Sequence, residues 1–193
     1  MEKCSSIVSL KGQMRNVGNL IDEIRRSRKR VLAAVDKLTP AQGAFKAAPN
    51  EWCINEILEH LVLAEQSGIT KMWLAADGIR SGKPVWTGAH TNRGLSIDDV
   101  IARTWKAQEA APALCTPMFG GPLAYWKEAF ALSERLLDAL TPALEGLDVE
   151  NVIYPHFISG PLDLGQRLEF LRFHMDRHLS QIERVKQTPG FYS

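Results

Sequence analysis

Apolar residues recur at intervals of three and four along most of the chain, which is the spacing that places side chains on one face of an α-helix. The first such stretch predicts a helix over about 16–38, ahead of Pro40. Three further long helices are predicted over about Trp52 to Gly78, Leu123 to Leu140, and Leu162 to Gln187. Leu136 and Leu137 are expected on the buried face of the third of the four long helices.

Two stretches that contain Gly and Pro, 80–95 and 112–122, separate the second long helix from the third. Between them, Ser96 followed by Asp99 is typical of a helix N-terminus, and it predicts a short helix over about Ile97 to Gln108. The segment 153–161 is expected to be extended or to turn. The pattern therefore predicts an all-α fold, a single four-helix-bundle domain over residues 1–193 with one short extra helix between the second and third long helices.

Composition narrows the classes of partner. The 193 residues suit one domain, and 23 Lys and Arg against 22 Asp and Glu give a formal net charge of +1. This balance gives no electrostatic reason to expect nucleic acid or an anionic membrane as partner. No apolar run reaches the roughly 20 residues that span a bilayer, and the first residues lack the apolar core of a secretory signal. A cytoplasmic location is therefore expected.

The three cysteines, Cys4, Cys53 and Cys115, are an odd number at scattered positions. Such a pattern does not predict a disulfide framework, and the sequence has no CxxC motif for a thiolate zinc site. Reduced thiols are expected.

The candidate chemistry lies in the histidines. His174 and His178 are four residues apart on the last predicted helix, so their side chains lie on the same face. That face also carries the main apolar residues of the helix, which turns both imidazoles inward. Two stacked inward imidazoles need polar partners, and a shared metal ion supplies one. The HExxH motif of zinc proteases does not apply, because Met175 follows the first histidine.

A third ligand is expected from another helix. His60 lies in the middle of the apolar surface of the second long helix. Three histidines leave at least one coordination position open, which is typical of a catalytic rather than a purely structural site. Imidazole suits zinc, nickel, iron and copper, so one divalent ion is predicted, zinc or nickel first and iron next.

Two residues are candidates for catalysis beside the predicted ligands. Glu56 is one helical turn before His60 and could act as a base or orient a ligand, or it could instead bond to the helix N-terminus. Gln181 lies on the face of His174 and His178. It could orient a histidine ring or contact the substrate, or it could bond to a neighbouring helix.

Other polar residues and the two long connections could contribute to a binding site. Arg177 could attract an acidic substrate, although most arginines in such a position are solvated. His156, in the turn before the last helix, is more often a non-ligand than a ligand, and His90 is expected at the surface. The two long connections are long enough to shape a cavity mouth, which Trp86, Met118 and Phe119 could line.

Three segments carry a resemblance to a known family. WCINEILEHL at 52–61 and FHMDRHLSQI at 173–182 resemble two signatures of the DinB/YfiT-like superfamily, and YPHFISGPL at 154–162 is similar to the turn before its last helix. The resemblance covers about 50–186. It departs from the family at Cys53, where Ser is usual; Cys is a poorer helix-capping acceptor, at a cost on the order of 1 kcal/mol.

The resemblance implies an up-down-down-up bundle, often a homodimer, with a metal bound by His60, His174 and His178. Relatives include transferases that use low-molecular-weight thiols such as bacillithiol, and a mycothiol-dependent maleylpyruvate isomerase. The implied activity is a metal-dependent, thiol-dependent S-transfer to a small molecule. A metal-dependent hydrolase and a non-catalytic metal-binding or dimerisation module stay open as alternatives.

Overall fold

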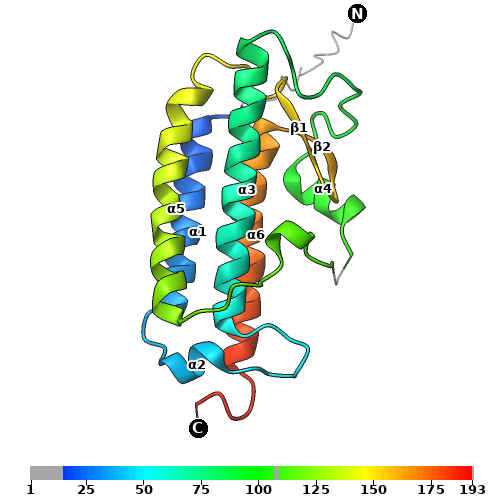
Figure 1. Cartoon of the computed structure of the whole chain (residues 1–193). Coiled ribbons are helices and arrows are strands. Elements are labelled where there is room, and N and C mark those ends of the chain that lie inside the picture. The colour runs from blue at the N-terminus through cyan, green and yellow to red at the C-terminus, as the bar shows by residue number, and fades with distance from the viewer. Residues whose placement is uncertain (1–14, 107–108, 193) are drawn as a thin grey trace, which may run out of the picture.

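The computed structural model describes residues 15–106 and 109–192. Four long helices form a bundle: α1 (Val17–Val35), α3 (Ile54–Arg80), α5 (Leu123–Leu144) and α6 (Leu164–Lys186). Figure 1 shows that α1 and α6 run in one direction along the bundle while α3 and α5 run in the other. This is the up-down-down-up order, and the predicted all-α fold is confirmed.

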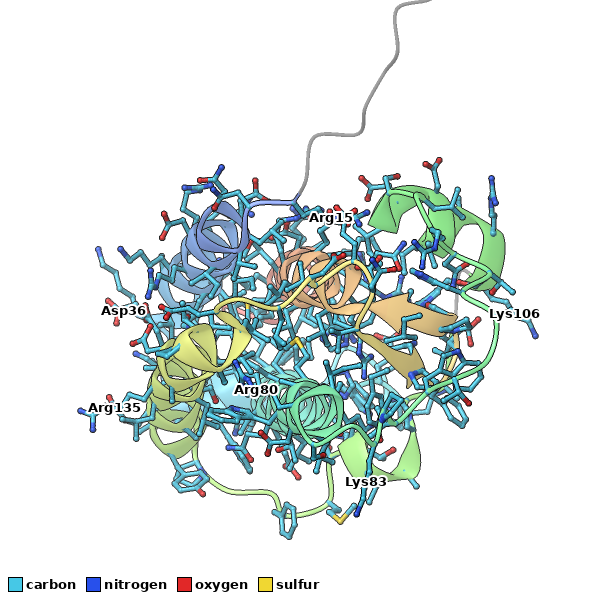
Figure 2. The ribbon with its side chains drawn as sticks, turned by 90° about the horizontal axis from the view of Figure 1, so that it is seen from above. Arg15, Asp36, Arg80, Lys83, Lys106 and Arg135 are labelled. Carbon is cyan, nitrogen blue, oxygen red and sulfur yellow. The ribbon has the colours of Figure 1, made fainter. Side chains whose placement is uncertain are left out.

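The bundle core is aliphatic and continuous. α1 packs mainly against α6, and α3 packs against both α5 and α6. Figure 2 shows the four helices as the corners of the bundle when it is viewed from above, with charged side chains such as Asp36 and Arg135 at the rim. The core contains completely buried side chains from every one of the four, among them Ile24, Leu58, Phe130 and Leu168. None of the helices in the described ranges is long and apolar enough to cross a membrane.

Smaller elements lie along one face and at one end of the bundle. α2 (Pro40–Ala44) follows α1, α4 (Ile97–Thr104) and the 3₁₀ turn η1 (Ala113–Cys115) lie in the connection from α3 to α5, and β1 (Ile153–His156) pairs antiparallel with β2 (Gly160–Asp163). The hairpin, α4 and η1 all lie outside the bundle on the side of α3 and α6 (Figure 1).

Several boundaries differ from the sequence prediction for local reasons. Pro40 begins a helix rather than only following one, because Thr39 and Gln42 form a capping box around it. Pro142 lies inside the last turn of α5 instead of ending the helix at Leu140. The short helix predicted to Gln108 ends at Thr104, and residues 107 and 108 are outside the described part of the chain.

The extended segment before α6 is a true two-stranded hairpin, so the last helix starts at Leu164 rather than Leu162. Asp163 caps that helix and forms a capping box with Gln166. The predicted burial of Leu136 is wrong: it is 43% exposed, while its neighbour Leu137 is fully buried. The hairpin and the cap fix where α6 begins, and thereby the rotation of the histidine face toward α3.

Candidate metal centre

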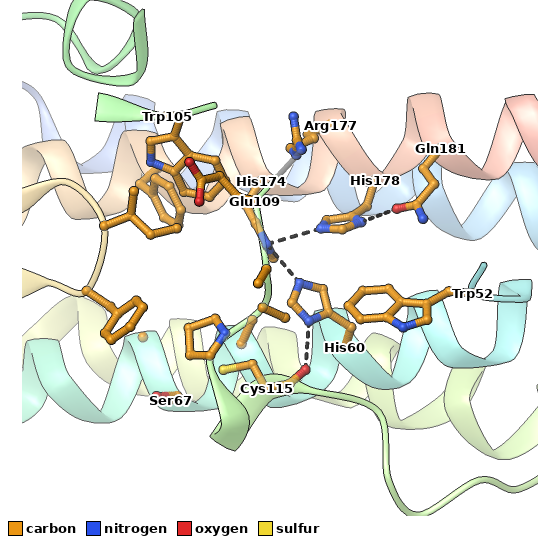
Figure 3. Close-up of a pocket in the computed structure, with 18 of the residues that line it drawn as sticks. Trp52, His60, Ser67, Trp105, Glu109, Cys115, His174, Arg177, His178 and Gln181 are labelled. Atoms are coloured by element: carbon orange, nitrogen blue, oxygen red, sulfur yellow. Dashed lines mark hydrogen bonds between the residues drawn. The ribbon is translucent and has the colours of Figure 1, made fainter. Parts of the chain in front are cut away.

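Three histidines meet between α3 and α6. His60 comes from α3, and His174 and His178 come from successive turns of α6. All three are buried, and their ligand atoms all lie within 4.8 Å of one another. They form the one group of this kind among the described residues. Figure 3 shows the three rings pointing toward a common centre.

The spacing of the ring nitrogens fits a metal ion. His174 Nε2 lies 3.1 Å from His60 Nε2 and 3.2 Å from His178 Nε2. Two ligands of a tetrahedral zinc ion at 2.0–2.1 Å are about 3.3 Å apart. Both distances therefore match the spacing of ligands around one ion, and the ligand atoms of all three residues lie within 4.8 Å of one another.

The hydrogen bonds behind the rings fix where their protons lie. His60 Nδ1 is 2.7 Å from the carbonyl oxygen of Cys115, and His178 Nδ1 is 2.8 Å from Gln181 Oε1. Because these oxygens only accept, both Nδ1 atoms donate, and the Nε2 atoms of His60 and His178 present lone pairs to the centre. His174 has at most one Nε2 proton to share between them, whereas a cation satisfies all three nitrogens.

Burial keeps the three imidazoles neutral, the form that binds a metal. Burial lowers the pKa of His178 to about 3, with the neighbouring His60 adding to the shift. Burial also lowers the pKa of His174 far below its usual range and lowers that of His60. The ring of Trp52 lies 4.9 Å from His60 and 6.4 Å from His178, so it covers the centre on one side.

Glu59 supports the centre from behind, a role that was not predicted. Its carboxylate is 1% exposed and accepts the backbone N–H groups of Met118, Phe119 and Gly120 at 2.5–3.1 Å. This holds the chain just after η1 against α3. The same segment carries the Cys115 carbonyl that orients His60, so Glu59 positions a ligand through the loop.

The centre opens into a cavity of about 820 Å³. Its walls come from α3, α6, η1, the hairpin and the segment around Trp105. Trp105, Phe170 and Phe173 form an aromatic cluster in which the ring of Phe170 stacks on His174. A cavity of this size accommodates a small molecule beside the three histidines.

The structure separates the two catalytic candidates. Gln181 lines the cavity and accepts from His178 Nδ1, so it fixes the orientation of that ring. Glu56 accepts from the Cys53 backbone N–H at 2.8 Å and pairs with Lys46, and it is not among the residues that line the cavity. The observed role of Glu56 is the helix-capping alternative, and Lys46 and the Cys53 N–H help keep its pKa below the usual value.

The two described cysteines and the two remaining histidines lie outside the three-histidine cluster. Cys53 and Cys115 are buried free thiols, and Cys4 is outside the described residues. His156 lines the cavity but is not one of the three clustered ligands. The predicted exposure of His90 is wrong: its side chain is 4% exposed, with Nε2 3.3 Å from Gln166 Oε1.

The predicted residues of the cavity mouth are also wrong. Trp86, Met118 and Phe119 do not line the cavity, and Met118 and Phe119 are 63% and 70% exposed. Leu114 and Phe157 take that place instead, on η1 and in the hairpin turn.

Comparison with models of protein families gives a match over most of the chain. The sequence model of the DinB superfamily matches residues 23–182, a range that includes all three histidines. Neither a search of curated proteins nor a search of solved structures gives a match.

Proposed function

Because the chain belongs to the DinB superfamily, we propose that it is a metal-dependent enzyme of small molecules that transfers a low-molecular-weight thiol to an electrophilic substrate. The observation that carries the proposal is the convergence of three neutral, buried imidazole nitrogens at the wall of a cavity of about 820 Å³. A purely structural ion would not need such a cavity beside it.

The residues around the centre favour a thiol over water as the nucleophile. A divalent ion held by His60, His174 and His178 would lower the pKa of a thiol or a water molecule at its open position. An ordinary thiol has a pKa near 8.5, so it ionises with little help, whereas activation of water benefits from a general base.

Among the described residues, neither of the two α3 carboxylates beside His60 is free to act as that base. Glu56 is held by Lys46 and the Cys53 N–H, and Glu59 by three backbone N–H groups. This argues for thiol chemistry. In such a reaction the sulfur bonds to an electrophilic carbon, and the leaving group departs with the electron pair of the broken bond.

This chain's own residues hold and shield the reacting groups. The Cys115 carbonyl and Gln181 fix two of the rings, and Trp52 keeps bulk water from one side. The aromatic cluster around Trp105 offers an apolar surface for the second substrate. These contacts pre-organise the centre so that little rearrangement is needed when the substrates bind.

Metal analysis of protein purified without a histidine tag tests the premise. We expect about one zinc, nickel or iron ion per chain, and near-complete loss of it in His60→Ala, His174→Ala and His178→Ala. His156→Gln is the matched control, because it removes a cavity histidine outside the cluster and should retain the ion. Equal metal content in all four variants would contradict the proposal.

Assays with defined thiols separate the reactions. Bacillithiol, mycothiol and glutathione are each supplied with an electrophile such as an alkyl halide, and loss of free thiol is followed. Turnover that requires both the thiol and the three histidines supports S-transfer. Ester hydrolysis at the same rate with and without a thiol would instead identify a hydrolase.

A further inference from the structure

A second group of polar residues lies in the same cavity, away from the three histidines. Arg167, Lys71 and His156 line it from α6, α3 and β1. Arg167 is seven residues before His174 on the same face of α6, which places the two about 10 Å apart along the helix axis. The cavity therefore has two ends with different chemistry, the histidine centre and this second group.

Among the described residues, Arg167 is a buried cation with no counter-ion. It is 5% exposed, and no carboxylate of the described residues lies within ion-pair distance of it. Its Nε has no hydrogen-bond partner, and its Cζ lies over the Tyr154 ring, 5.5 Å from the ring centroid. Burial lowers the pKa of Arg167 to about 10, so the side chain is still charged at pH 7. A buried charge without a partner is costly, and a ligand anion would relieve that cost.

Lys71 and His156 extend the cationic character of this end. The ammonium of Lys71 is close enough to affect both His156 and Cys115. Burial, and then the charges of Arg167 and Lys71, lower the pKa of His156 to about 3, so its ring is neutral.

All three side chains offer donors only. Lys and Arg have no acceptor, and His156 Nδ1 accepts the backbone N–H groups of Ile158 and Ser159 at 3.2 Å each. The remaining proton of His156 is therefore on Nε2. An acceptor-only group, such as a carboxylate or a phosphate, matches these donors.

The acidic residues of the cavity do not fill this role. Glu51 and Glu109 are its two carboxylates, and neither forms an ion pair with Arg167 or Lys71 within the described part of the chain. Figure 3 shows Glu109 beside Trp105. It accepts the backbone N–H of Lys106. The cationic end is thus open to an anion from outside the chain.

We propose that Arg167, Lys71 and His156 bind an anionic group, a carboxylate or a phosphate, at the far end of a substrate whose reactive end lies at the three histidines. The part about the reactive end depends on the proposed function. Between the two ends the cavity wall carries Phe170 and Leu171. The substrate is therefore an elongated molecule with an apolar middle, which must span the two-turn separation of Arg167 and His174, about 10 Å along the helix axis.

Bifunctional thiols test the proposal in the cobalt-loaded protein. ω-Mercaptoalkanoic acids of increasing length are compared with the ω-mercaptoalcohols of the same length and with ω-mercaptoalkyl phosphates. The thiolate-to-cobalt absorption band reports binding of the sulfur. We expect the acid or the phosphate of matching length to bind about tenfold or more tightly than the alcohol. The better of the two identifies the anion.

Arg167→Gln should remove this preference and leave the affinity for the alcohol unchanged. Arg172→Gln is the matched control, since Arg172 is also on α6 but pairs with Glu23 and Asp176 outside the cavity. If Arg167→Gln does not fold, Lys71→Gln takes its place, with a severalfold loss for the anionic probes alone. Equal affinities of wild-type protein for acid, phosphate and alcohol at every length would overturn the proposal, as would equal loss for all probes in the variants.

Failure of the proposed function gives a different result. If no thiol produces the cobalt band, thiol chemistry is excluded and the anion site is tested by itself. Calorimetry of metal-free protein with octanoate and inorganic phosphate then gives the answer. Binding that Arg167→Gln abolishes supports the anion site, and no binding of either probe overturns it.

Discussion

The metal-free protein should lose stability steeply in mild acid. The perturbation is a change from pH 7 to pH 5 in the presence of a chelator. His156 and His178 have a pKa of about 3 in the folded chain, against about 6.5 in an unfolded one. Between these values the unfolded state binds the extra protons, so the free energy of unfolding falls as the pH falls.

The magnitude follows from this shift. Each such histidine loses about 1.9 kcal/mol between pH 7 and pH 5, so His156 and His178 together lose about 4 kcal/mol. This is a large part of a typical total of about 5–15 kcal/mol. For a chain of this length it corresponds to a fall in Tm of roughly 8–15 °C. The lowered pKa values of His60 and His174 act in the same direction.

Urea unfolding at half-unit steps of pH measures the slope directly. Burial raises the pKa of Glu65 and Asp163, which opposes the effect, so the wild-type slope is compared with that of His178→Gln. The variant should have a slope smaller by about 1.4 kcal/mol per pH unit below pH 6, because one titrating group is gone. Equal slopes would refute the claim that His178 is neutral and buried in the folded chain.

Four further predictions concern groups around the centre and in the core. Glu59→Gln should weaken metal binding about tenfold, because a neutral amide holds the loop behind His60 less firmly; competition with a chelator measures this. Gln181→Leu should cost about tenfold in the same assay, since the donor bond of His178 loses its acceptor. Cys53→Ser should raise the free energy of unfolding by roughly 0.5–1 kcal/mol through a better cap, measured by urea unfolding. Glu65→Leu should cost about 3–5 kcal/mol by leaving Arg28 unpaired, and adding Arg28→Met should recover most of that loss in the same unfolding assay.

The long helices and the three clustered histidines could be predicted because their signals are local. Helical periodicity needs only neighbouring residues, and the spacing of His174 and His178 on the inward face of α6 follows from it. His60 was found in the same way, from its place on an apolar face of α3. The family resemblance then joined signals that lie far apart in the chain.

The features that were missed depend on contacts between distant segments. The Glu59 carboxylate is buried against residues 118–120, which are far from it in the chain. The sequence did carry one signal: Glu59 lies in an apolar run, with Leu63 one helical turn later, and a carboxylate in such a place needs a polar partner. The burial of His90 depends likewise on Gln166, which is 76 residues away in the chain. The spatial neighbours of Arg167 come from the β1–β2 hairpin and α3, so its lack of a counter-ion could not be recognised before those elements were placed.

The clamp between Glu59 and the chain after η1 has a consequence for how the centre responds to its ligands. That segment carries both the Cys115 carbonyl behind His60 and the Leu114 side chain at the cavity wall. A molecule that binds the cavity better with the segment in another position must therefore change the affinity for the ion. By thermodynamic reciprocity, the ion changes the affinity for that molecule by the same factor. Binding of a molecule in the cavity and binding of an ion by the three histidines would then be thermodynamically linked.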